Sequence, residues 1–180
     1  MPNEQLFTVF VIDDDDDIRS SLSRALGKRG YLVEIFSSAS QFLEEYDKSK
    51  LGCVILDYGM PEMNGLELQQ HMKQQAINLP IIFITGHGGI PESVQAIKEG
   101  AIDFLEKPFR QKTLVSCIEM AFGTLLEVQQ LEQCYKQLQD NFDRLTNREK
   151  EVAQFIVLNP SSTSSKDIGR HLEISPRTVD

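Results

Sequence analysis

The sequence predicts an α/β fold in which helices cover both faces of a parallel β-sheet. Five short apolar runs alternate with amphipathic, helix-like segments between Leu6 and Leu126. This alternation is typical of repeated strand–helix–strand units, which place their strands in parallel. At 180 residues and 41% hydrophobic content, the chain is long enough for one such domain plus a smaller piece. Ligands of such sheets bind at the carboxyl ends of the strands, where the strand order reverses.

The predicted strands are rich in aliphatic and aromatic residues, and the helices between them carry start and stop signals. The strands cover residues 6–12, 31–36, 53–56, 81–85 and 101–105. The helices cover residues 18–29, 41–46, 65–75 and 92–99. Their boundary signals are Gly30, a Ser38/Gln41 capping box, Asn64, and Pro91 with Gly100.

Residues 13–17 are five consecutive aspartates that directly follow the first strand. Like charges repel one another, and Asp is a poor residue for the interior of a helix or a strand. One explanation is helix capping, which we expect of residues 15–17 because carboxylates bind free N–H groups at a helix start. The other is a divalent-cation site, since Mg²⁺ prefers oxygen ligands. The run by itself leaves both open.

Polar residues also follow the other predicted strands, at the same edge of the sheet. Asp57 ends the third strand, Thr85 ends the fourth, and Lys107 follows the fifth. A carboxylate such as Asp57 can act as a nucleophile toward phosphorus, and Asp13 and Asp14 can hold a Mg²⁺ that offsets the negative charge. Each residue met alone also fits a plain role at a turn, strand end or surface. Their joint placement favours a phosphoryl-transfer site.

The segments VIDDD, VILDYGMPEMNG, IFITGHGG and DFLEKPF resemble, in order and spacing, the receiver domain of two-component response regulators. The resemblance covers about residues 5–126. It implies the flavodoxin-like strand order 2-1-3-4-5, and a sensor histidine kinase as the phosphate donor. It also implies a Mg²⁺ or Mn²⁺ cofactor, with Asp57 as the phosphoacceptor and Asp13 and Asp14 as the acidic pair. The implied metal ligands are Asp14, Asp57 and the Gly59 carbonyl, while Asp13 acts mostly through water. Thr85 and Phe104 are the implied switch residues, and Lys107 is joined to Pro108 by a bond that is often cis in this family.

The same resemblance implies a conformational switch. Phosphorylation adds negative charge and acceptor oxygens at Asp57, and Thr85 then moves toward them. Phe104 turns into the vacated space, which reshapes the face built from the fourth helix, the fifth strand and the fifth helix. We expect that face to form a symmetric homodimer contact. The alternative for Phe104 is a plain buried strand residue.

A long helix is predicted beyond the receiver, because no Gly or Pro interrupts residues 124–145. Apolar residues recur there in steps of three and four, the pattern of a coiled-coil seam. This predicted dimer seam comprises Val128, Leu131, Tyr135, Leu138, Phe142 and Leu145. The alternative is an amphipathic helix folded back on its own domain. The predicted domains are thus a receiver over residues 1–126, a helical linker over 127–144, and a third part over 145–180.

Residues 145–180 resemble the start of a LuxR-type helix-turn-helix domain of the FixJ-like branch. Leu145, Thr146, Arg148, Glu149 and Val152 match its opening helix, residues 166–172 its scaffold helix, and residues 174–179 the turn into its recognition helix. The 159–165 loop is about three residues longer than in the usual pattern. The sequence stops at Asp180, so promoter-DNA binding is expected only with further C-terminal helices. Five basic and five acidic residues balance in this part, so the net charge of −9 lies in residues 1–144.

Composition excludes other classes. No apolar stretch approaches the roughly 20 residues that span a bilayer, so we expect a cytoplasmic protein without a membrane partner. Cys53, Cys117 and Cys134 lack metal-ligand spacing and are predicted to be reduced, mostly packing residues. His87 is interpreted as a loop residue without a catalytic role.

Three functions are compatible with parts of this pattern. The leading hypothesis is a phosphorylation-dependent transcriptional regulator whose receiver catalyses only its own phosphotransfer and dephosphorylation. A haloacid dehalogenase-type phosphohydrolase needs a second acid two positions after its nucleophile, and Gly59 stands there. A signalling adaptor that acts only through dimerisation is the third, and promoter binding by the extended chain would separate it from the first.

Overall fold

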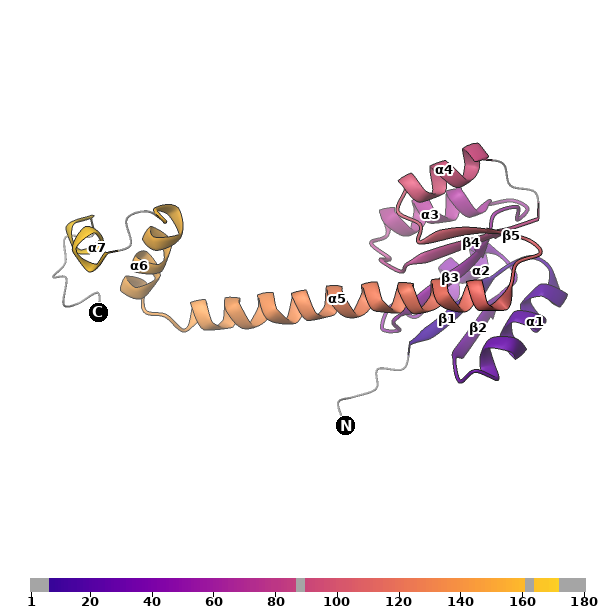
Figure 1. Cartoon of the computed structure of the whole chain (residues 1–180), viewed down its shortest axis with the longest axis horizontal. Helices are drawn as coiled ribbons and strands as arrows, with labels where there is room; N and C mark the ends of the chain where they lie inside the picture. The colour runs from indigo at the N-terminus through magenta and orange to yellow at the C-terminus, as the bar shows by residue number, and fades with distance from the viewer. Residues whose placement is uncertain (1–6, 87–89, 161–163, 172–180) are drawn as a thin grey trace. The chain divides into compact units, whose positions relative to one another are not determined.

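A five-stranded, all-parallel sheet forms the centre of the first part of the chain (Figure 1). The computed structural model describes residues 7–86, 90–160 and 164–171. The strand order is β2-β1-β3-β4-β5, which confirms the predicted fold class and order. The strands are β1 (Thr8–Ile12), β2 (Leu32–Phe36), β3 (Gly52–Asp57), β4 (Ile81–Thr85) and β5 (Asp103–Glu106).

Within the described ranges, five helices alternate with these strands, and two short helices follow. Their bounds are α1 (Asp16–Gly27), α2 (Ala39–Glu45), α3 (Gly65–Gln74), α4 (Ile90–Lys98), α5 (Gln111–Asp143), α6 (Asn147–Leu158) and α7 (Ser165–His171). None of the helices in the described ranges is long and apolar enough to cross a membrane.

The sheet is buried on both faces because alternate residues of each strand point to opposite sides. Phe10 and Ile12 belong to one core cluster, which also contains Phe42 of α2 and Leu68 of α3. Val9 and Val11 belong to the other, with side chains from α1 and α5. The two clusters give three layers, helix, sheet and helix, and hold the strand ends in fixed positions.

Several predicted boundaries were wrong by a few residues. Helix α1 ends at Gly27 rather than Arg29, because the chain already turns at residues 28–30, where Gly30 has a positive φ of 90°. Helix α4 begins at Ile90, so Pro91 lies inside its first turn, where the missing N–H breaks no helical hydrogen bond. Strand β5 begins at Asp103 instead of residue 101.

The predicted Ser38/Gln41 capping box is only half formed. Ser38 is the N-cap of α2, and its Oγ accepts a hydrogen bond from the Gln41 N–H at 3.1 Å. The Gln41 side chain does not return to Ser38; its Oε1 accepts from the Ser37 N–H at 2.8 Å. Asn64 and Glu67, by contrast, form a complete capping box at the start of α3.

Helix α5 runs without interruption from the core of the sheet domain into the predicted linker. The chain divides into two compact units, Met1–Val128 and Gln129–Asp180, and α5 contributes to both. The helix ends at Asp143, so Leu145 lies in the following bend, where its N–H bonds to the Phe142 carbonyl at 3.1 Å. The prediction that Leu145 belongs to the helical seam is therefore wrong.

Within the second unit, α6 and α7 form a small helix pair. Thr146 and Glu149 form a capping box at the start of α6, as expected for an opening helix. Phe155 of α6 and Ile168 of α7 are buried, and the Phe155 and His171 rings lie 4.5 Å apart. The predicted turn into a recognition helix, residues 174–179, lies outside the described residues, as does His87.

Candidate functional site

The parallel register brings the predicted polar residues to one edge of the sheet. Ile12 pairs with Leu56, and Asp57 pairs with Ile84. Asp13 therefore leaves β1 beside the end of β3, and Thr85 ends β4 next in line, opposite Glu106 of β5. The edge between β1 and β3 is also where the strand order reverses, the position at which such sheets bind ligands.

Lys107 connects two of these carboxylates. Its Nζ lies 2.8 Å from Oδ2 of Asp13 and 2.7 Å from Oδ1 of Asp57. Asp13 and Asp57 are both buried, and the Lys107 side chain is 22% exposed. Lys107 is thus not a solvated surface lysine: it links residues far apart in the sequence, from three different strand ends, into one charged cluster.

Burial and the ion pairs compete in setting the pKa values of this cluster. Burial raises the pKa of Asp13 above its ordinary value, more than the hydrogen bonds from Lys107 and Asp15 lower it. Partial burial disfavours the charged form of Lys107, but the hydrogen bonds and charges of Asp13 and Asp57 outweigh this and raise the pKa of Lys107. The lysine therefore stays a cation at neutral pH.

Backbone N–H groups fix the remaining carboxylate oxygens. Oδ2 of Asp57 accepts from the Gly59 N–H at 2.7 Å, and Oδ1 of Asp13 accepts from the Asp15 N–H at 2.9 Å. Asp57 thus has one oxygen toward Lys107 and the other toward the turn that follows β3. Gly65 helps to form this corner, because a Cβ at that position would lie 2.8 Å from the Asp57 carbonyl oxygen.

The acidic run serves the first of the two roles that the sequence left open, helix capping. Asp15 is the N-cap of α1, and its Oδ1 accepts from the N–H groups of Asp17 and Ile18. Asp13 faces Lys107 instead. Sequence reasoning missed Arg19, which is buried, donates to the Asp13 carbonyl and pairs with Asp16. Arg19 thus ties α1 to the site.

The donor set at this edge fits a hard divalent cation. Asp13, Asp14 and Asp57 supply three carboxylates against the single charge of Lys107, and oxygen donors are those that Mg²⁺ and Mn²⁺ prefer. As the side chains stand, Lys107 bridges Asp13 and Asp57 while Asp14 is exposed to solvent. Accordingly, no group of three acidic, His or Cys side chains in the described ranges is already arranged around a metal position.

Thr85 and Phe104 lie next to this cluster. Thr85 is buried at the end of β4, and its carbonyl accepts from the Lys107 N–H at 2.7 Å. Phe104 is partly buried, with its ring centroid 6.0 Å from that of Tyr58 and 5.9 Å from that of Phe83. The Lys107–Pro108 peptide bond is cis.

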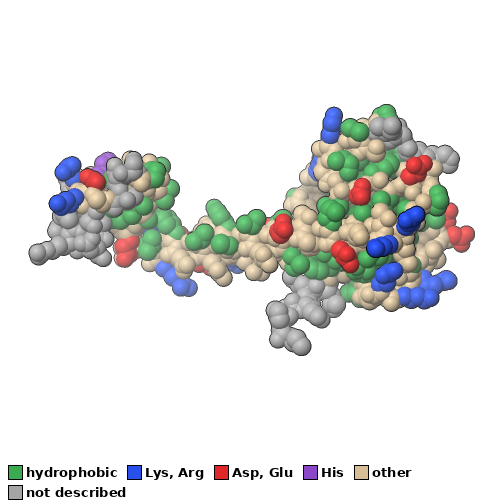
Figure 2. Space-filling view, in the orientation of Figure 1, with side chains coloured by type: hydrophobic (Ala, Val, Ile, Leu, Met, Phe, Trp, Pro, Cys, Tyr) green, Lys and Arg blue, Asp and Glu red, His purple; other side chains and the backbone are tan. Residues whose placement is uncertain are grey.

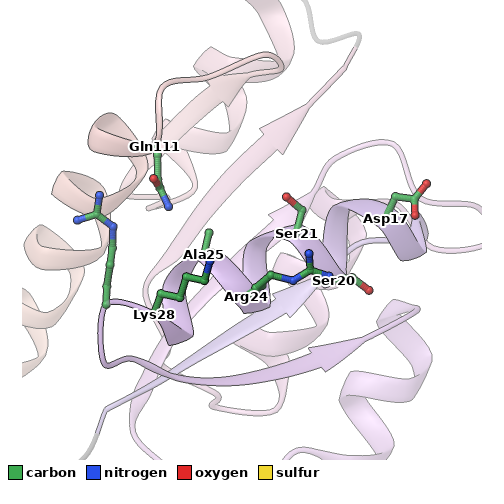
Figure 3. A pocket seen from close by; sticks show the side chains of 8 residues that line it. Asp17, Ser20, Ser21, Arg24, Ala25, Lys28 and Gln111 are labelled. Atoms are coloured by element: carbon green, nitrogen blue, oxygen red, sulfur yellow. The ribbon is translucent and has the colours of Figure 1, made fainter.

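A groove of about 680 Å³ lies along α1, next to the start of α5 (Figure 3). Its lining includes Arg24, Lys28 and Arg29 from α1 and its C-terminal turn, with Gln111 from the start of α5. Asp17 is its one acidic residue. This face is positive on a chain with a net charge of −9, so it attracts anionic groups. Sequence reasoning missed it, although the spacing of Arg24 and Lys28, four residues apart in a helix, could have indicated it.

The cysteines have no role in the site. Cys53 and Cys117 are buried, and burial raises the pKa of their thiols to about 12 and about 11, respectively. Cys134 of α5 is exposed, so for this residue the predicted packing role was wrong.

Comparison with known proteins gives a consistent match. The family model of the response regulator receiver domain matches residues 9–119. The response regulator protein TodT of Pseudomonas putida is 38% identical over 177 residues, which cover 98% of this chain and 77% of the relative. The transcriptional regulatory protein FixJ of Bradyrhizobium diazoefficiens is 37% identical over 172 residues, covering 96% and 82%.

Solved structures agree with these sequence relatives. A low-resolution structure of the response regulator StyR matches with a TM-score of 0.79 and 41% identity, over 96% of this chain and 85% of that one. Full-length FixJ from B. japonicum matches with a TM-score of 0.64 and 36% identity, over 96% and 84%. Both matches extend beyond the sheet domain into α5 and the helices that follow.

Proposed function

Because the chain belongs to the two-component response regulators, and its sheet domain is their receiver domain, we propose that Asp57 is the phosphoacceptor and that its phosphorylation controls the rest of the chain. The observation that carries this proposal is the cluster of Asp57, Asp13 and Lys107 at the switch point of the sheet. Receiver domains are generally not metabolic enzymes. We propose accordingly that the chemistry here is limited to the domain's own phosphorylation and hydrolysis.

The geometry supports the following sequence of events. An oxygen of Asp57 attacks the phosphorus of a phosphohistidine, the P–N bond breaks, and the imidazole of the donor leaves. Lys107 is already 2.7 Å from that carboxylate and stays positive, so it can pair with a phosphoryl oxygen as the negative charge arrives. Receiver domains in general bind Mg²⁺ at this place, where the cation offsets charge on the nucleophile and on the phosphoryl group. In this chain we propose Asp13, Asp14, Asp57 and the Gly59 carbonyl as its binding residues.

The switch is proposed to involve Thr85 and Phe104. Once Lys107 pairs with the phosphoryl group, Asp13 loses part of its bond with Lys107, and the Thr85 hydroxyl becomes a second donor to the new oxygens. Phe104 already contacts the Tyr58 and Phe83 rings, so a displacement at the end of β4 is transmitted to it. The expected result is a reshaped α4–β5–α5 face that favours a homodimer.

The partners follow from the family. Response regulators interact with histidine kinases, and FixJ-like members act as transcriptional regulators on DNA. For this chain we propose a sensor histidine kinase as phosphate donor, and promoter DNA as the target when the helix-turn-helix domain is complete. Residues 1–128, 129–143 and 145–180 are the proposed receiver, linker helix and start of the DNA-binding domain, close to the predicted boundaries.

Incubation with acetyl phosphate tests the chemistry directly. We expect one phosphate per chain by intact-mass spectrometry in the presence of Mg²⁺, because the cluster carries an excess of negative charge that otherwise repels the donor. Removing Mg²⁺ with a chelator should abolish incorporation, and adding Mn²⁺ should restore it. Equal incorporation with and without metal would contradict the proposed cation site.

Replacement of Lys107 separates phosphorylation from its output. Lys107→Ala keeps the nucleophile but removes the cation that both carboxylates share, so we expect phosphorylation by acetyl phosphate to persist and phosphate-induced dimerisation to be lost. Sedimentation velocity with and without acetyl phosphate measures this. Phosphate-induced association equal to wild type would exclude Lys107 from the switch.

A further inference from the structure

One apolar stripe on α5 has no covering group in the described part of the chain. The first half of the helix buries Leu114, Ile118 and Ala121 against the sheet. Beyond it, four apolar residues of the predicted seam, here called the α5 stripe, are largely exposed: Val128 (47%), Leu131 (70%), Tyr135 (70%) and Leu138 (63%). Hydrophobic side chains are visible along this half of the helix (Figure 2).

Phe142 continues the spacing of the stripe but is already covered. It is partly buried, lines a small apolar pocket with Val157 and Leu158 of α6, and lies under the ammonium of Lys150 at 5.6 Å. The stripe that remains for a partner therefore ends at Leu138. From Val128 to Leu138 a helix advances about 15 Å, or three turns.

The spacing of the stripe identifies its occupant. Its members recur in steps of three, four and three, which places them at the a and d positions of a heptad. Such a seam is complementary to itself, so a second copy of the same helix fits it. A two-fold axis that runs along the pair of α5 helices would align them in parallel, in the register that matches the two stripes.

The flanking charges oppose this pairing. In a parallel coiled coil, a residue at position g, directly before an a position, faces a residue at position e of the partner helix, directly after the next d position. Here these residues are Glu127 and Glu132, both exposed carboxylates, so a dimer contains two symmetric Glu–Glu contacts. The four apolar residues per helix also bury far less than the roughly 1,200 Å² typical of a stable complex. The stripe alone cannot hold two chains together.

We propose that the α5 stripe is a conditional dimer contact between two copies of this chain, kept weak by Glu127 and Glu132. It closes only when another contact raises the local concentration of one helix around the other. This inference rests on the proposed function, since the phosphorylated receivers would supply that contact. The stripe would then transmit dimerisation along α5 toward the second unit.

Charge reversal tests the proposal without phosphate. Glu127→Lys and Glu132→Lys each replace the two like-charge contacts with Lys–Glu pairs, so each should strengthen self-association of the full chain about tenfold. The double variant restores like charges and should return to the wild-type value. Asp140→Lys changes the net charge equally on the opposite side of α5 and is the matched control. Sedimentation equilibrium of the unphosphorylated proteins gives the dissociation constants.

Only a direct contact between position 127 of one copy and position 132 of the other predicts that each single variant strengthens self-association and that the double variant does not. Steady strengthening from wild type through the single variants to the double variant would show a general charge effect and overturn the proposal, as would equal strengthening by Asp140→Lys. These measurements do not depend on Asp57 chemistry. If acetyl phosphate did not strengthen self-association in any variant, the result would count against the proposed function but not against the stripe as a dimer contact.

The parallel orientation has its own readout. Leu131→Cys, placed in a Cys134→Ser background, should form a disulfide between two copies when the stripe closes, because identical d positions adjoin in a parallel pair. Gln133→Cys on the outer face is the control and should remain reduced. Cys53 and Cys117 are buried and do not compete. An antiparallel pair that aligned the two stripes would place Leu131 opposite Tyr135 instead, and absence of the 131–131 disulfide under associating conditions would overturn the parallel arrangement.

Discussion

Asp57→Asn is expected to abolish phosphate incorporation. The amide of Asn is not a nucleophile toward phosphorus, whereas the carboxylate of Asp57 is held at the switch point of the sheet, 2.7 Å from the Lys107 ammonium. The loss should be complete with acetyl phosphate as donor, measured by intact-mass spectrometry after incubation with Mg²⁺. Asp140→Asn removes the same charge from an exposed position on α5 and should be phosphorylated like wild type.

The Asp57→Asn protein should still fold. Lys107 keeps its contact with Asp13 at 2.8 Å, and the amide oxygen of Asn can accept the Gly59 N–H in place of Oδ2. We therefore expect the free energy of unfolding to change by less than about 1.5 kcal/mol. Phosphate on another residue of the folded variant would disprove the assignment of Asp57, whereas an unfolded variant would show that the Asp57–Lys107 pair is needed for stability.

Gly52→Ala is expected to give the largest loss of stability. Gly52 begins β3 and pairs with Thr8 of β1 in the middle of the sheet. A Cβ at this position would overlap the Thr8 carbonyl oxygen and lie 3.0 Å from the Phe10 ring. Because the obstacle is backbone of a central strand, the pairing itself must shift. We expect a loss of at least about 3 kcal/mol in the free energy of unfolding, measured by urea denaturation.

Gly123→Ala is the matched control for this experiment. Gly123 lies in α5, and a Cβ added there would have no neighbouring atom within 4 Å. Alanine at this position should stabilise the protein by about 0.5–1 kcal/mol, because Gly is a poor helix former and is more flexible in the unfolded chain. Equal stability of Gly52→Ala and wild type would mean that β1 and β3 do not approach as closely as described.

The strands, their order of appearance and the residues at their ends were predictable from the sequence. Each apolar run is short and ends at a polar residue, and in a parallel sheet all such ends meet at one edge. Asp13, Asp57, Thr85 and Lys107 could therefore be predicted from the sequence alone to meet at one edge. Helix boundaries were less predictable, because capping signals are local and compete with one another, as the half-formed Ser38/Gln41 box illustrates.

Contacts within the site depended on the tertiary structure. Lys107 is 50 residues from Asp57 and 94 from Asp13, and no local pattern encodes that its ammonium bridges both. The burial of Arg19 and the exposure of Asp14 likewise depend on how α1 packs beside the sheet.

The sequence by itself determined the fold class, the edge of the sheet at which the polar strand-end residues meet, and the heptad spacing of α5, because these depend on periodicity along the chain. Only the tertiary structure decided which charges pair, where α5 ends, and which part of its apolar face remains exposed. These depend on distances between residues far apart in the sequence, which are set by packing of the whole domain.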